Sequence, residues 1–117
     1  MIRKLAILLA LCVSMPAMGA TCKISEYWAL KNDSGISIPV ADEPSIARQE
    51  VTYTSSTQSV AFNAQTRFVR IVCDAKAHFV FGANPSAAAT DPYLPADVPE
   101  YFGVTPGHEV AFYDGTT

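Results

Sequence analysis

The residues of this chain that could do chemistry are few, and they begin with two histidines. His78 and His108, with Cys73 or a carboxylate, supply the side-chain types of a catalytic triad or a zinc site. Their spacing matches no metal-ligand pattern, and no nucleophile elbow, zinc-protease, C-x-x-C or Gly-rich phosphate motif occurs. We therefore expect ordinary histidines and a protein that is not an enzyme, with no catalytic residue, metal site or cofactor.

Acidic residues are the second candidates, since carboxylates bind hard cations such as calcium. Asp42 and Glu43 are adjacent, and Asp91, Asp97 and Glu100 lie within one segment of the chain. Acids dispersed in this way through polar segments are more simply explained as solvated loop charges. We expect no cation site.

Cys22 and Cys73 are candidates for a disulfide, because they are the two cysteines outside the first twenty residues. A bridge between them would close a loop of about 50 residues and stabilise the fold by roughly 4 kcal/mol in the chain-entropy model. Such a bond needs an oxidising compartment. Sequence alone does not give the distance between the two Cα atoms, so two unreactive thiols are the alternative.

The first twenty residues have the layout of a secretory signal peptide. Two basic residues precede an apolar run from Leu5 to Val13, and small residues follow at 17–20. The run is shorter than the roughly 20 residues that span a bilayer. We expect residues 1–20 to be a signal-like helix that is removed, with no stable membrane insertion afterwards. The alternative is that translation starts near Met18 and that the upstream residues are an artefact.

The remainder of the chain, residues 21–117, is acidic, with six Lys and Arg against eleven Asp and Glu. Negative net charge repels nucleic acid and anionic membranes. The basic residues are scattered along the sequence without a stripe that could follow a phosphate backbone. They are Lys23, Lys31, Arg48, Arg67, Arg70 and Lys76. We expect a protein partner and no nucleic acid.

The elements that must position these residues are predicted to be β-strands throughout. No window has helical periodicity, whereas short runs rich in Val, Ile, Phe, Tyr and Thr alternate with turn-forming clusters. The runs are 23–30, 36–40, 49–54, 59–63, 67–73, 77–82, 101–104 and 109–113. They predict a single all-β domain over 21–117, a small antiparallel β-sandwich or jelly-roll-like barrel of seven or eight strands.

Turn chemistry indicates how several strands connect. Residues 32–35 are rich in Asn, Asp and Gly, 105–107 combine Pro and Gly as a type II turn prefers, and 74–76 has hairpin length. Pro39 places its strand at a sheet edge or a bulge. Within the run 67–73, the better candidates for the core share one face. They are Val69, Ile71 and Cys73.

The segment 83–100 is the candidate binding region. Four prolines and three consecutive alanines make it irregular, and long loops on a rigid sheet commonly carry binding surfaces. The candidate contact residues are Asn84, Tyr93, Leu94 and Tyr101, since aromatic side chains offer contact area at low entropy cost. The alternative is that these side chains fold back as a lid over the end of the sandwich.

Four stretches resemble small β-sandwich proteins encoded by tailed bacteriophages. They are Gln58–Phe62, Thr66–Ile71, Phe81–Pro85 and Tyr101–Gly107, in about half of the chain. The shared features are strand cores followed by Gly and Pro turns. The resemblance implies a virion structural or accessory protein and carries over no active-site residue. The apparent export signal departs from that group, whose members begin close to the first strand.

Together these features favour a non-enzymatic virion component, of head-decoration or fibre type, that binds capsid or other virion proteins or copies of itself. It would reside in the virion if translation starts near Met18. We expect contacts at the edge strand Ile36–Val40, at Tyr93 and at Tyr101. The alternative is an exported periplasmic or cell-surface module that recognises a protein or glycan through 83–100, which a Cys22–Cys73 bridge would favour.

Overall fold

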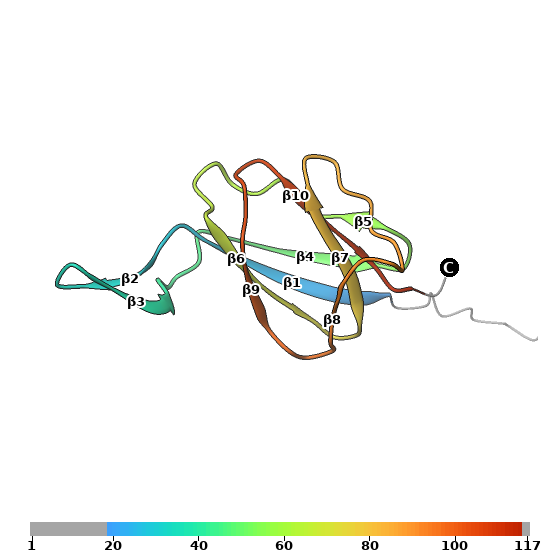
Figure 1. Cartoon of the computed structure of the whole chain (residues 1–117), viewed down its shortest axis with the longest axis horizontal. Coiled ribbons are helices and arrows are strands. Elements are labelled where there is room, and N and C mark those ends of the chain that lie inside the picture. Colours follow the sequence, from blue (N-terminus) through green and yellow to red (C-terminus); the bar gives the residue numbers. More distant parts are fainter. Residues whose placement is uncertain (1–18, 116–117) are drawn as a thin grey trace, which may run out of the picture.

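The computed structural model describes residues 19–115, which form ten β-strands and no helix. Two four-stranded antiparallel sheets enclose the core, and a two-stranded hairpin projects from one end (Figure 1). The strands are β1 (Ala20–Tyr27), β2 (Leu30–Asp33), β3 (Ile36–Ala41), β4 (Ala47–Tyr53), β5 (Thr57–Gln58), β6 (Phe68–Cys73), β7 (Ala77–Gly82), β8 (Tyr93–Leu94), β9 (Glu100–Gly103) and β10 (Glu109–Tyr113). The all-β prediction is confirmed. Of the signal segment expected over 1–20, residues 1–18 lie outside the described part, and Ala20 already begins β1.

The first sheet has the strand order β4-β1-β6-β9, and the second has the order β5-β10-β7-β8. Alternating side chains of both sheets meet between them, as the period of two in a strand requires. The expected core face of β6 is confirmed, because Val69, Ile71 and Cys73 are all buried. Ile24 and Val51 from the first sheet pack with these residues, and the second sheet contributes Leu94, Val110 and Phe112.

The expected hairpin at residues 74–76 is wrong. This connection instead carries the chain from β6 in the first sheet to β7 in the second. The Tyr53 hydroxyl stabilises this connection by hydrogen bonding, since it lies 3.1 Å from the carbonyl oxygens of both Ala75 and Lys76. Loop length alone could not distinguish the two geometries, because a short connection can join neighbouring strands or opposite layers.

Tyr53 makes the stability of the fold sensitive to alkaline pH. Burial, with the negative charges of Asp74 and Asp114, raises the pKa of Tyr53 from 10.0 to about 12. Between these values the unfolded chain releases the phenolic proton while the folded chain keeps it, so stability present below pH 10 is lost as the pH rises towards 12. We expect the urea midpoint to fall across this window. In Tyr53→Phe the fall should be smaller, and an unchanged slope would contradict this assignment.

The expected strand at 59–63 is not a regular strand. Its backbone still bonds to β10, through Ser59 N to Val110 O at 2.7 Å and Phe62 N to His108 O at 2.8 Å. Between these two bonds, the Val60 backbone is bonded to a side chain of β4: the Gln49 amide donates to the Val60 carbonyl and accepts from the Val60 N–H. This segment therefore closes one side of the sandwich.

The turn prediction at residues 32–35 is confirmed. Ser34 and Gly35 both have positive φ, at 53° and 81°, which is the requirement of a tight two-residue hairpin loop. The Asn32 side chain accepts a hydrogen bond from the Gly35 N–H at 3.0 Å. The predicted first strand, 23–30, is divided here: β1 ends at Tyr27, and Leu30 already belongs to the projecting hairpin.

The turn at 105–107 is also as expected. Gly107 has a φ of 80°, and the His108 N–H donates to the Thr105 carbonyl at 3.1 Å. These features match a type II turn with Pro at its second and Gly at its third position. The turn leads from β9 in the first sheet to β10 in the second, so it connects the two sheets of the sandwich.

Candidate binding groove

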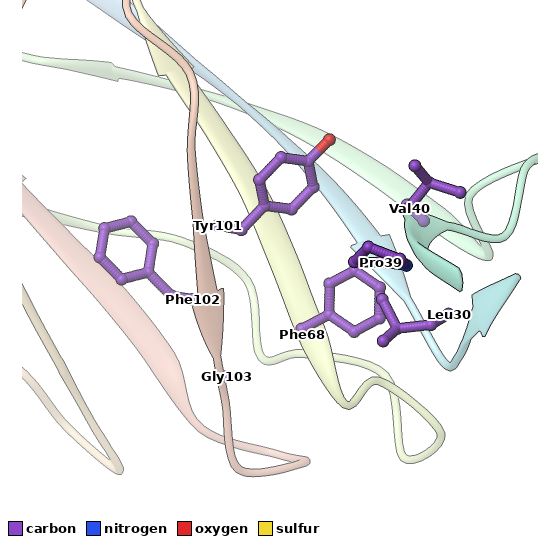
Figure 2. Close-up of a pocket in the computed structure, with 8 residues that line it drawn as sticks. Leu30, Pro39, Val40, Phe68, Tyr101, Phe102 and Gly103 are labelled. Atoms are coloured by element: carbon purple, nitrogen blue, oxygen red, sulfur yellow. The ribbon is translucent and has the colours of Figure 1, made fainter. Parts of the chain in front are cut away.

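An apolar groove of about 700 Å³ lies between the base of the hairpin and the first sheet. Its lining residues come from β2, β3, β6 and β9: Leu30, Pro39, Val40, Ala41, Phe68, Tyr101, Phe102 and Gly103. Figure 2 shows Phe68 and Tyr101 on the side of β9 that faces the hairpin, with Phe102 on the other side. The groove thus lies over the outer face of β6 and β9, on the side of the hairpin.

Phe102 anchors β9 to the core of the sandwich. Its ring packs on Phe79 and Phe81 of the second sheet, with ring centroids 5.1 and 5.2 Å apart. Such aromatic pairs stabilise beyond the area they bury, by about 0.5–1.5 kcal/mol each. Because side chains alternate along a strand, anchoring Phe102 in the core turns Tyr101 and Gly103 outward.

An aromatic row lies on the outer face of the first sheet, and two of its members, Phe68 and Tyr101, line the groove. Tyr27 stacks on Phe68 at 5.2 Å, and Phe68 lies 6.3 Å from Tyr101 between ring centroids. The Tyr27 hydroxyl donates to Glu43 at 2.6 Å. Burial first, and then this carboxylate, raises the pKa of Tyr27, so the hydroxyl keeps its proton and ties the chain after the hairpin to the sheet.

The hairpin continues the apolar surface beyond the groove. Ile36 is 70 % exposed, Val40 is 53 % exposed and Leu30 is 42 % exposed, although all three are apolar. Ile36, Ile38 and Val40 alternate along β3 and therefore share a face. In a sequence this alternation is typical of a half-buried strand, but here the face has no covering element within residues 19–115.

The four residues expected to form a binding loop are not brought together. Leu94 is fully buried in the core, and the Asn84 side chain accepts a hydrogen bond from Gln58 at 2.7 Å. Tyr93 is 55 % exposed, but its ring lies beneath the Lys76 ammonium group, 4.2 Å away, at the edge of the second sheet. Tyr101 alone lines the groove.

Part of the 83–100 segment acts as a cover, which was the alternative interpretation. Leu94 fills the core from β8, and the Phe79 N–H donates to the Pro92 carbonyl at 3.0 Å. Ala87 packs with Ala111 and Tyr113 on the outer face of the second sheet. That face is therefore partly covered.

His78 is held in structural contacts. The His78 Nδ1 lies 2.8 Å from the Asp91 carbonyl, and its ring contacts Tyr93 and Tyr113. Among residues 19–115, no three His, Cys, Asp or Glu side chains approach closely enough to hold a metal ion. The same residues contain no helix long and apolar enough to cross a membrane.

Three basic residues that are scattered in the sequence share the outer face of the first sheet. Arg48 and Arg70 lie opposite Ser25 from either side, and Lys23 is the next outward residue on β1. Lys23 pairs loosely with Glu50 at 3.8 Å, whereas neither arginine has a carboxylate within 4.0 Å among the described residues. Three of the six basic residues that are scattered along the sequence therefore lie on one face in the folded protein.

The disulfide between Cys22 and Cys73 is present. The two cysteines are directly opposite in the β1–β6 ladder, and both are buried. The alternation of side chains in β1 and β6 places both cysteines on inner faces. Their meeting in one pair depends on the register between two strands that are far apart in the sequence.

Sequence reasoning missed the groove because its two walls come from separate regions. Pro39 indicated that its strand lies at a sheet edge or a bulge, and Tyr101 was a candidate contact residue. No local signal showed that the hairpin would project and face β9. No protein-family model matches this chain, and no curated protein or solved structure is significantly similar to it.

Proposed function

We propose that this protein is a non-enzymatic docking module that binds another protein through the groove and the apolar face of its hairpin. The observation that carries the proposal is the groove itself, whose lining is predominantly apolar and continues onto the exposed hairpin. Exposed apolar surface of this kind is characteristic of interaction sites. Tyr101 provides a rigid aromatic contact at the rim, of the type enriched in protein interfaces.

Val40→Asp tests this proposal. The hairpin makes few contacts with the sandwich, so a charge there should change the free energy of unfolding by no more than about 0.5 kcal/mol. It should nevertheless weaken association with the native partner or assembly by about tenfold or more, because a carboxylate would be desolvated in an apolar interface. Co-sedimentation from the native source, with a quantified bound fraction, measures the effect.

Ser37→Asp is the matched control, because it adds the same charge at an exposed residue of the same strand that does not line the groove. If both variants bind like the unaltered protein, the groove is not the docking site. A protein that is strictly monomeric in its native source, without association with any particle or complex, would contradict a docking function altogether.

The cellular setting has two candidates. The disulfide supports an exported module of the periplasm or cell surface, because such bonds persist in oxidising compartments. The resemblance of Gln58–Phe62 and Tyr101–Gly107 to phage proteins supports a virion accessory protein, and a projecting apolar hairpin suits attachment to neighbouring subunits.

The intact mass of the protein from its native source separates these settings. A start at Ala20 or Thr21, with the mass lowered by two thiol hydrogens, would establish processing and export. A start at Met18 or Gly19 with free thiols would contradict export and favour assembly in the cytoplasm.

A further inference from the structure

The two long edges of the first sheet differ in how they are covered. Along β4, the Gln49 side chain bonds both backbone groups of Val60, so the 59–63 segment lies beside this strand. On the opposite side, β9 pairs with β6 and with no other strand among the described residues. An uncovered strand edge is a template for pairing with another chain, and Tyr101 and Gly103 of this strand also line the groove.

The backbone of β9 shows which groups are free. The Val104 N–H donates to the Arg67 carbonyl at 3.0 Å, and Gly103 lies opposite Phe68 in the same antiparallel ladder. Because hydrogen-bonded and non-hydrogen-bonded pairs alternate, the N–H and C=O groups of Gly103 and Tyr101 point away from β6. No described residue bonds to these outward groups.

Side chains around this edge define what would fit it. Towards the hairpin the outer face is apolar, with Phe68, Leu30 and Val40 in the groove. One row further along, Arg70 lies directly opposite Tyr101, and its guanidinium has no carboxylate within 4.0 Å among the described residues.

The charge of the surroundings favours an acidic occupant. Arg48 and Lys23 add positive charge on the same outer face, where Glu50 is the acid that pairs with Lys23. Glu100, the nearest acid on β9, is opposite Ile71 and so belongs to the other face of the strand. A positive face on an otherwise acidic domain attracts carboxylates over roughly 8–10 Å at moderate salt.

We propose that β9 accepts an extended segment of a partner protein as a fifth strand of the first sheet. This segment places an apolar side chain in the groove and a carboxylate two residues further along, on the side of Arg70. The inference rests on the proposed docking function and specifies its mode, which is β-strand addition. Backbone bonds to Tyr101 and Gly103 provide affinity, and the apolar and acidic positions provide selection.

The added strand can run parallel or antiparallel to β9. Two capped hexapeptides with reversed sequences, TLTETE and ETETLT, therefore serve as probes. Amide chemical shifts of the isotope-labelled protein report binding. We expect one of them to shift the Tyr101 and Gly103 amides with a dissociation constant of about 1 mM or lower. Slower exchange of these amides with deuterium should accompany binding. Failure of both peptides to shift them at several millimolar would overturn the proposal.

Gly103→Pro removes one outward N–H without removing an internal hydrogen bond, and should weaken the better peptide at least about fivefold. Gly103→Ala is the matched control: a Cβ at this position has no heavy atom within 4 Å, and the N–H is kept. Equal weakening by both variants would contradict a backbone bond. Alternate N-methylation of the peptide tests the same bond without altering the protein.

A comparison of acidic with basic peptides tests the preference for carboxylates. The lysine counterparts TLTKTK and KTKTLT should bind at least about fivefold more weakly, and Arg70→Ala should reduce this difference, whereas Arg67→Ala should not. Equal binding of acidic and basic peptides would overturn the charge assignment. If Val40→Asp abolishes association with the native partner while Gly103→Pro leaves it unchanged, the docking function stands and strand addition fails.

Discussion

Replacing Cys22 and Cys73 together with alanine is expected to lower the free energy of unfolding by about 4 kcal/mol. The bond joins neighbouring central strands, β1 and β6, across a sequence separation of 51 residues. Without it the unfolded chain regains the freedom of that loop, and truncating two buried side chains adds a cavity cost. Since small domains have only about 5–15 kcal/mol of stability, the variant should be marginally folded. Urea unfolding of both proteins measures the difference.

Reduction provides an independent control for the disulfide. The unaltered protein, unfolded in the presence of a thiol reductant, should approach the stability of the double variant, while the variant itself should not respond to reductant. Because both cysteines are at most 1 % exposed, the folded protein should react slowly with reductant. A difference of less than about 1 kcal/mol between oxidised and bridge-free proteins would contradict a stabilising bridge.

Replacing Glu26 with alanine is expected to cost about 3 kcal/mol or more. Glu26 is only 3 % exposed, and its Oε1 accepts hydrogen bonds from the Asn63 N–H at 2.9 Å and the Thr66 hydroxyl at 2.8 Å. Thr66 is completely buried, so truncation leaves its hydroxyl without this acceptor. Urea unfolding gives the loss, and faster amide exchange at Asn63 should locate it.

Two controls separate the buried contact from a general charge effect. Glu26→Gln keeps an acceptor oxygen at this position and should cost clearly less than the alanine variant. Glu50→Ala removes a carboxylate whose side chain is 65 % exposed and should change stability by no more than about 0.5 kcal/mol. A Glu26→Ala variant as stable as Glu50→Ala would show that the contact contributes nothing.

Local patterns were sufficient where neighbouring residues decide the conformation. The positive φ of Gly35 and Gly107 follows from turn chemistry at those positions, and the buried face of β6 follows from alternation. The strand at Ile36–Val40 was also found, with Pro39 indicating its edge character. Each of these features depends on a few consecutive residues and on the steric preferences of Gly and Pro.

Local patterns failed where the partner of a strand matters. Residues 74–76 have hairpin length, yet they connect the two sheets, and the Tyr53 hydroxyl bonds to two of their carbonyl oxygens. The segment 59–63 has strand composition, yet the Gln49 side chain takes over part of its pairing. Leu94 was expected among contact residues because it lies in a Pro-rich segment, but the fold needs its side chain in the core.

By itself, the sequence determined that this domain is built from β-strands, where several of its turns lie, and which side chains of β6 face the core. Only the tertiary structure decided that Cys22 meets Cys73, that Arg48 and Arg70 share a face, and that the hairpin and β9 enclose a groove. The reason is that alternation and turn geometry act within a few residues, whereas register and layer packing join segments far apart in the chain. Those long-range pairings are chosen by burial of the whole core, which no single stretch of sequence contains.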